Sequence, residues 1–407
     1  MEFKTMRNTI ICTVGTSLLA NLKNLKPENA MEFELKSAFI QSEPDKIAEA
    51  LLWFSPEERI CGAEINTIAS LKKMHRYKDL DLKNFRFLLS DTKDGEITGA
   101  ILQNYFVRAW EKLGLNQEPT CVCRRVVNLQ DERPWDFRHY GLRNLVKEIS
   151  AAVREAGSLD ACVIDATGGY KAQIAIAVMF GQMTGVPVFY KHERFNEIID
   201  FPPLPVNFDF SLYEEYFDLL YRLCIGNEVF DEISLPGYFG ASSVDGMTES
   251  PAFQRFRVFL DECSETSAHQ KKALYDASAV AYIYFEAAQQ RMDNHIRHHI
   301  HDYLPACSDA ERKEPHLTDD HFPDGFERYV RSVYTKYAWI KGIHTIPYDK
   351  QKGIRNTGFY LQTINNEKQL IGTYVDRNNF GARFRILLKD NSVTALHAAL
   401  WLLTENK

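Results

Sequence analysis

The sequence predicts an α/β protein in three parts: a parallel-sheet domain, a mostly helical domain and a small α+β domain. Three observations carry this prediction. Residues 161–190 read strand, glycine turn, helix and strand; apolar residues at helical spacing dominate from 206 onward; and turn-forming residues separate short apolar runs beyond 323. With 407 residues, 45% of them hydrophobic, the chain is long enough for two or three domains with buried cores.

Residues 161–190 contain the clearest pattern. A buried strand is predicted over 162–164, a helix over 171–183 and a second strand over 186–190, which together make a parallel pair with a right-handed crossover. The motif Thr167-Gly168-Gly169 separates the first strand from the helix. Glycine turns let backbone N–H groups approach an anion, and a helix N-terminus favours negative charge, so we expect a phosphate to bind here. A tight turn without any ligand explains the same glycines equally well.

Two earlier strands also end in small polar residues. The strand predicted over 10–14 is followed by Gly15-Thr16-Ser17. The strand predicted over 85–89 ends in Ser90-Asp91-Thr92, ahead of a helix over 97–110. Because the carboxyl ends of parallel strands meet at one edge of a sheet, the three loops together predict a polar site large enough for a nucleotide.

These three motifs, in this order, resemble the CRISPR-associated Rossmann-fold (CARF) sensor domains over about residues 1–205. The resemblance implies a Rossmann-like fold and a homodimer that binds a cyclic oligoadenylate across its twofold axis. Phosphates and adenosines suit turn N–H groups, hydroxyls and a lysine as donors. The resemblance assigns ligand contacts to the following residues: Thr16, Ser17, Leu18, Ser90, Thr92, Thr167, Gly168, Gly169 and Lys171.

Composition points to the cytoplasm. No apolar run approaches the roughly 20 residues of a membrane helix, and the N-terminus lacks the apolar core of a signal peptide. The eight cysteines are scattered and are expected to be reduced thiols. Cys121 and Cys123 form the only close pair, and without a second pair or matching histidines they do not predict zinc. We therefore expect no metal and no cofactor.

The proline-rich segment 201–205 ends the first domain, because successive prolines cannot pair in a sheet. Residues 206–322 then form a second domain. Helices are predicted over 212–224, 252–261 and 268–290, with a loop of small residues over 237–250. This domain is expected to be a helical linker or a winged-helix module.

Arg291 and His298 fit the arginine, six residues, histidine pattern of the HEPN ribonucleases. In that family the arginine steadies the phosphate and the histidine moves protons. A solvated helix end, whose cations favour the C-terminal dipole, explains the same residues. The HEPN fold is also entirely helical, whereas the chain beyond Pro323 turns to strands.

Residues 323–407 form the third predicted domain. From 327 to the end, 13 Lys and Arg stand against 6 Asp and Glu, a net charge of +7 in a chain whose total is −7. A basic module on an acidic body is typical of a domain that handles a polyanion. The pattern predicts one helix and four strands, in this order: helix 326–337 and strands 358–364, 369–375, 383–388 and 393–403.

The last two predicted strands resemble the C-terminal hairpin of RelE-type messenger-RNA interferases. The family's central arginine, after a glycine and at the start of the penultimate strand, falls on Arg383. The family's two lysines are absent; Tyr374 and Asp376 stand in their place. Guanidinium groups fit phosphate oxygens bidentately, so Arg383, with Arg377, is expected to stabilise the scissile phosphate. Proton transfer is assigned to His397, Tyr374 or Lys341. A purely structural role, as a side chain packed in a strand, explains His397 as well.

The whole arrangement resembles the CRISPR-associated messenger-RNA interferases of type III systems, which cyclic tetra-adenylate activates. The resemblance implies metal-independent cleavage of messenger RNA at the ribosome. Two alternatives stay open. One is a HEPN-type ribonuclease acting on free RNA through Arg291 and His298; the other is a winged-helix transcription regulator that responds to a cyclic oligoadenylate without catalysis.

Overall fold

The computed structural model describes residues 7–73, 80–192, 197–205, 208–267, 270–318, 322–346, 357–364, 367–378 and 380–405. Its contacts group the chain into two compact units. Unit 1 holds Met1–Asp209 and Leu223–Ala287, and unit 2 holds Phe210–Arg222 and Ala288–Lys407. The division into three domains at 205 and 322 stays a prediction.

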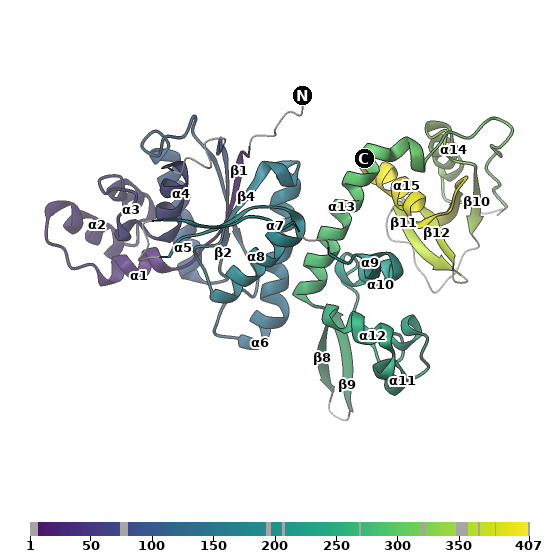
Figure 1. Cartoon of the computed structure of the whole chain (residues 1–407), viewed down its shortest axis with the longest axis horizontal. Coiled ribbons are helices and arrows are strands. Elements are labelled where there is room, and N and C mark those ends of the chain that lie inside the picture. The colour runs from purple at the N-terminus through teal and green to yellow at the C-terminus, as the bar shows by residue number, and fades with distance from the viewer. Residues whose placement is uncertain are drawn as a thin grey trace. The chain divides into compact units, whose positions relative to one another are not determined.

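Unit 1 is built on a mixed α/β layer with a six-stranded sheet in the order β3-β2-β1-β4-β5-β6 (Figure 1). The strands are β1 Thr9–Thr13, β2 Asn84–Leu89, β3 Thr120–Arg125, β4 Cys162–Asp165, β5 Val188–Tyr190 and β6 Ile199–Phe201. All pairs are parallel except β5 with β6. This confirms the α/β class and the strands predicted near 10, 85, 162 and 186. The order reverses between β1 and β4, where doubly wound sheets bind ligands.

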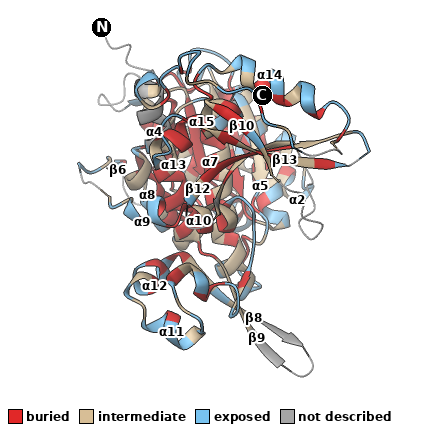
Figure 2. Cartoon of the chain, turned by 90° about the vertical axis from the view of Figure 1, so that its right-hand side faces the viewer, coloured by how far each residue is buried: buried red, intermediate tan, exposed pale blue. Residues whose placement is uncertain are grey.

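Helices cover both faces of this sheet, as right-handed crossovers require. The longer ones are α1 Ser17–Asn24, α2 Ala30–Ile40, α3 Pro44–Leu51, α4 Ala63–Lys73, α5 Lys93–Ala109, α7 Leu142–Ala156 and α8 Lys171–Thr184. One core lies between the sheet and α1 to α5, where Phe85 and Phe87 stack on Phe106 with ring centroids 5.0 and 5.6 Å apart. Buried residues accordingly concentrate in the strands and the inner sides of the helices (Figure 2).

The rest of unit 1 contains a three-stranded sheet that the sequence analysis missed. Its strands are β7 Phe230–Asp231, β8 Leu260–Ser267 and β9 Gln270–Ala277, in the order β7-β9-β8. The helices predicted over 252–261 and 268–290 are therefore wrong in part: α12 covers Pro251–Phe256, and α13 begins at Ala279 and runs to Tyr303. Lysine, alanine and glutamate favour helix locally, but antiparallel pairing over the whole length of β8 overrides that preference.

The short helices α9 Ser211–Glu215, α10 Phe217–Cys224 and α11 Val244–Glu249 complete the middle of the chain. The C-terminal part of unit 2 is an α+β layer of α14 Phe326–Lys336 and a four-stranded antiparallel sheet. The sheet has the order β10-β13-β12-β11, with β10 Gly342–Ile346, β11 Gly358–Ile364, β12 Glu367–Val375 and β13 Gly381–Leu387. Three of the four strands were predicted. Phe326 of α14 packs on Phe384 of β13, which fixes the helix on one face of the sheet.

The strand predicted over 393–403 is wrong, because α15 Val393–Glu405 is a helix. Its apolar residues are continuous and so fit either period, but the run is longer than a typical strand. The Ser392 hydroxyl accepts a hydrogen bond from the Ala395 N–H at 3.3 Å, a helix cap that the turn composition concealed. The expected C-terminal hairpin is thus a strand followed by a helix. None of the helices in the described part of the chain combines the length and apolar character needed to cross a membrane.

Candidate functional site

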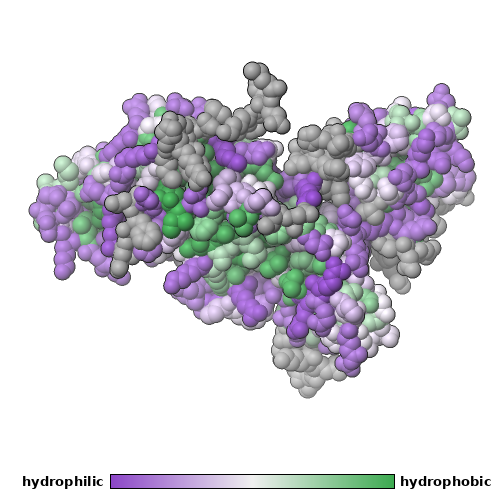
Figure 3. All heavy atoms as spheres, viewed as in Figure 1, coloured by the Kyte–Doolittle hydropathy of each residue, from purple (hydrophilic) through white to green (hydrophobic). Residues whose placement is uncertain are grey.

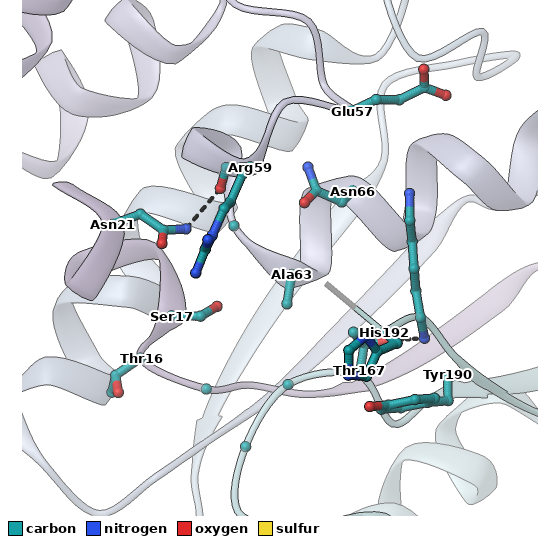
Figure 4. Close-up of a pocket in the computed structure, with 15 residues that line it drawn as sticks. Thr16, Ser17, Asn21, Glu57, Arg59, Ala63, Asn66, Thr167, Tyr190 and His192 are labelled. Carbon is teal, nitrogen blue, oxygen red and sulfur yellow. Dashed lines mark hydrogen bonds between the residues drawn. The ribbon is translucent and has the colours of Figure 1, made fainter. Parts of the chain in front are cut away.

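A polar cavity of unit 1 lies where the sequence predicts a ligand. It opens at the carboxyl ends of β1 and β4 and has a volume of about 450 Å³. Its walls come from the two glycine turns, from the start of α1 and α4 and from the residues after β5 (Figure 4). The lining residues are Gly15, Thr16, Ser17, Asn21, Glu57, Arg59, Gly62, Ala63, Asn66, Thr167, Gly168, Gly169, Tyr190, Lys191 and His192.

The two glycine turns touch each other, which explains why side chains are absent there. A Cβ on Gly15 would lie 2.6 Å from the Gly169 nitrogen. A Cβ on Gly168 would lie 2.1 Å from Glu64 Oε1 and 2.7 Å from the Thr13 carbonyl oxygen. Gly169 adopts φ +97°, a region that other residues rarely enter. Backbone atoms therefore form the floor of the cavity, as a close approach to an anion requires.

Side-chain hydroxyl groups fix the position of the glycine turns relative to the sheet. The Thr13 hydroxyl donates to the Gly168 carbonyl at 2.6 Å. The Thr67 hydroxyl donates to Thr167 Oγ1 at 2.9 Å, and Thr167 Oγ1 also accepts from the Lys191 N–H at 3.0 Å. The Lys191 ammonium donates to the Ser70 hydroxyl at 2.6 Å. These bonds join the ends of β1, β4 and β5 to α4, so the cavity is preformed.

Two buried carboxyl groups lie behind the turns. Glu64 Oε1 accepts from the Gly15 N–H at 2.8 Å, and Asp165 Oδ1 accepts from the Thr167 N–H at 3.0 Å. Both residues are fully buried, and Glu64 Oε2 and Asp165 Oδ2 have no hydrogen-bond partner among the described residues. Burial raises the pKa of each carboxyl group to about 7. The site thus contains protons that titrate near neutrality.

These pKa shifts predict how stability depends on pH. In the unfolded chain both groups lose their protons near pH 4, whereas in the folded chain they keep them up to about pH 7. Their contribution is therefore fully present below pH 4 and is lost as the pH rises through 7. We expect Glu64→Gln to gain stability relative to the wild type between pH 5 and pH 8, by up to about 3 kcal/mol.

Urea unfolding at the two pH values measures this difference, with the exposed Glu49 replaced by Gln as the matched control. An equal difference between Glu64→Gln and wild type at both pH values would show that Glu64 does not titrate in this range.

Several cavity residues escaped the sequence analysis. Arg59 lies in the 3-10 turn Arg59–Cys61, and its side chain points toward Ser17 in Figure 4. Its position depends on the tertiary fold, since no local pattern marks it. Lys191 and His192 directly follow β5, so the rule applied to the other strands, that residues after a parallel strand share one edge, would have found them. Burial lowers the pKa of the Lys191 ammonium.

The predicted ligand contacts divide into two groups. Thr16, Ser17, Thr167, Gly168 and Gly169 line the cavity together. The others do not line it. The Leu18 side chain is fully buried in the core, and Lys171 is the exposed first residue of α8.

The hydroxyls predicted on the third loop serve the helix that follows it. Ser90 is buried and bonds the Thr92 hydroxyl at 2.9 Å. Thr92 caps α5 by accepting from the Gly95 N–H at 3.0 Å. Both hydroxyls are therefore engaged away from the cavity, and Asp91 is paired with Arg125.

A second candidate site is a cationic sheet face in unit 2. Arg383 and Arg385 are two residues apart on β13, so both side chains lie on one face. Arg385 is paired across the strands with His344 of β10, which shares that face. Neither guanidinium group makes a hydrogen bond or ion pair with the residues that the structure describes. Two unengaged guanidinium groups side by side can bind a phosphodiester.

The other predicted catalytic residues lie apart from these arginines. Tyr374 packs on Tyr329 of α14, on the opposite face of the sheet, and its hydroxyl donates to the Asp324 carbonyl at 2.8 Å. The backbone N–H of Lys341 donates to the Leu387 carbonyl at 2.9 Å. Leu387 is four residues along β13 from Arg383, which is about 13 Å at 3.3 Å per residue. Arg377 is exposed in the turn before β13.

His397 lies in α15 and is only 6% exposed. Its ring packs on Phe217 with centroids 4.2 Å apart and on Tyr213 at 5.8 Å. Burial lowers the pKa of His397 to about 3, so this imidazole is uncharged at neutral pH. A packed position in the core therefore explains His397 better than a catalytic role does.

The HEPN pair falls on α13. Arg291 is exposed and lies over the Phe210 ring at 5.5 Å, while the His298 side chain lies outside the described residues. No group of three or more histidine, cysteine or acidic side chains that could hold a metal occurs in the part of the chain that the structure describes.

Residues 59–204 match the model of a family of CRISPR-associated proteins, Cas_APE2256. The match supports a CRISPR-associated protein. The matched segment begins at Arg59, continues through β2 to β6, and includes the Thr167-Gly168-Gly169 turn and Lys191 of the cavity. No curated protein matches the chain. The CRISPR association thus attaches to the unit that contains the glycine-floored cavity, and the family match does not reach the cationic sheet face.

Proposed function

We propose that this chain is a CRISPR ancillary effector in which the unit 1 cavity binds cyclic tetra-adenylate and the unit 2 sheet then cleaves messenger RNA on the ribosome without a metal. The observation that carries the proposal is the cavity at the point where the strand order reverses, with a backbone floor and hydroxyl walls. Phosphates bind such turns through N–H groups, and Arg59 adds a cation. The CARF resemblance supports the same ligand class, and the family match supports a CRISPR-associated role.

The size of the cavity supports a dimer. Pockets that enclose drug-sized ligands occupy about 300–1,000 Å³, and this cavity lies in the lower half of that range. A ring of four nucleotides exceeds what one such cavity encloses. A second copy of the chain, related by a twofold axis, would supply the other half of the site.

The outer face of α8 is the surface we assign to that twofold contact. Hydrophobic residues gather over α8 in the view of Figure 3. Ile174, Ala175, Val178 and Met179 share one face of this helix, and none of them is buried. The helix starts directly after the Gly168-Gly169 turn, so a contact through this face would bring two cavities together.

We expect Met179→Glu to dissociate the dimer, because a carboxylate would be buried in an apolar interface. Met179 is 38% exposed. Light scattering after gel filtration would report the change from dimer to monomer. The control is Ile40→Glu on α2, where the side chain is 71% exposed and outside the proposed interface. A dimer that persists in the Met179 variant would place the contact on another surface.

The cationic sheet supports the nuclease half of the proposal. Cleavage of RNA without a metal requires stabilisation of charge on the phosphorane, which Arg383 and Arg385 can supply together. The deciding experiment combines the full-length protein with ribosomes, messenger RNA and cyclic oligoadenylates of different ring sizes. Cleavage only with cyclic tetra-adenylate and only on ribosomes is the expected result. Cleavage of free RNA would instead support the HEPN alternative.

A second candidate function follows from the middle of the chain. The elements α10, β7, α11, α12, β8 and β9 occur in the order helix, strand, two helices and hairpin, which is the order of a winged helix. This order supports a ligand-responsive regulator that binds DNA. Binding of duplex DNA without any ligand-stimulated RNA cleavage would favour that function over the nuclease.

A further inference from the structure

The edge of the unit 2 sheet holds a cluster of basic side chains around His344 and Arg385. His344 projects from β10 opposite Arg385 of β13. Beside β10, His316 forms a parallel bridge with His344: the His316 N–H donates to the Ile343 carbonyl at 2.8 Å, and the Thr345 N–H donates to the His316 carbonyl at 3.2 Å. These two bonds fix both backbones. The two imidazole rings are 5.9 Å apart at an interplanar angle of 70°, and both residues are exposed.

The surrounding charges are positive. Lys313 precedes His316 on the same segment, and its N–H donates to the Lys341 carbonyl at 2.8 Å. Burial, followed by the charges of His316, Arg385 and Lys313, lowers the pKa of His344. The nearby acids have other partners, since Glu311 pairs with Lys389 and Glu314 with Arg331. The cluster therefore attracts an anion and keeps one imidazole neutral.

We propose that His344 and His316 transfer the protons in RNA cleavage and that Arg385 binds the scissile phosphate between them. This inference rests on the proposed ribonuclease function. Two histidines beside an arginine are the groups that a metal-independent phosphodiester cleavage needs: a base, an acid and a charge stabiliser. His397 cannot serve because it is buried, and Tyr374 cannot because it lies on the other face of the sheet.

The reaction balances as follows. Neutral His344 takes the proton of the 2′-hydroxyl, and the 2′-oxygen forms a bond to phosphorus. Arg385 offsets the second negative charge on the phosphorane. The bond between phosphorus and the 5′-oxygen breaks, its electron pair leaves with that oxygen, and the imidazolium of His316 protonates it. The products are a 2′,3′-cyclic phosphate and a 5′-hydroxyl end.

The test is the rate of messenger-RNA cleavage on ribosomes with cyclic tetra-adenylate, measured from pH 5 to pH 9. We expect His344→Ala and His316→Ala each to lower kcat by about 10²–10⁴-fold. A base and an acid give a bell-shaped pH profile, so His344→Ala should lose the acidic limb. The products should carry 2′,3′-cyclic phosphates. His301→Ala, an exposed histidine of α13, is the matched control and should cleave at the wild-type rate.

The outcomes separate this inference from the proposed function. If the wild-type chain cleaves RNA and both histidine variants keep its rate and pH profile, the histidine assignment is wrong while the nuclease stands. If the wild-type chain cleaves no RNA under any condition, the proposed function and this inference fail together. Thermal unfolding of the variants checks that they fold; both side chains are exposed, so we expect unchanged midpoints.

Discussion

Arg383→Ala is expected to lower ligand-stimulated messenger-RNA cleavage by about 10²–10³-fold, the usual loss when one preorganised donor to a charged transition state is removed. Arg383 lies on β13 between Ile346 and Thr373, so rigid strands on both sides position its guanidinium. It shares its sheet face with Arg385 and His344, and the two arginines can hold one phosphate. Single-turnover cleavage on ribosomes measures the effect.

Two further variants make this prediction specific. Arg383→Lys should recover only part of the rate, because an ammonium keeps the charge without the bidentate fork. Arg328→Ala removes an exposed arginine of α14 and should leave the rate unchanged. Affinity for cyclic tetra-adenylate should be the same in all three variants. A wild-type rate for Arg383→Ala would make this arginine a surface residue and shift the search to Arg385, Arg377 and Lys341.

Gly168→Ala is expected to abolish measurable binding of cyclic tetra-adenylate. The new Cβ would lie 2.1 Å from the buried Glu64 Oε1 and 2.7 Å from the Thr13 carbonyl, which a central strand holds in place. The turn must shift, which misplaces the N–H donors of both glycine turns. Each lost hydrogen bond to a charged group costs about 1.5–3 kcal/mol, or roughly tenfold or more in affinity.

Calorimetric titration with cyclic tetra-adenylate measures the loss. Gly237→Ala is the control, because no atom lies within 4 Å of a Cβ at that position. The clash also predicts overpacking that destabilises unit 1 by about 1–3 kcal/mol. Wild-type affinity in a folded Gly168→Ala variant would show that the ligand binds away from the glycine turns.

Local sequence patterns predicted most strands of the six-stranded sheet and of the four-stranded sheet. Strands β1 and β4 contain continuous apolar runs because both faces of a parallel sheet are covered, and consecutive residues show this directly. The sequence also predicted the glycine turn at 167–169. By contrast, the polar hairpin of β8 and β9 was misassigned because strand pairing overrode its local preference. Helix α15 was misassigned because its continuous apolar run fits either period.

The candidate sites show the same division. The sequence by itself determined the α/β class, the turns that end β1 and β4, and the place of Arg383 at the start of β13, because each depends on neighbours in the chain. Only the tertiary structure decided that the turn after β2 stays outside the cavity, that Arg59 enters it, that Glu64 lies behind Gly15, and that His316 meets His344. Those contacts join segments that are distant in the sequence. Strand order and burial determine them, and no local sequence pattern encodes strand order or burial.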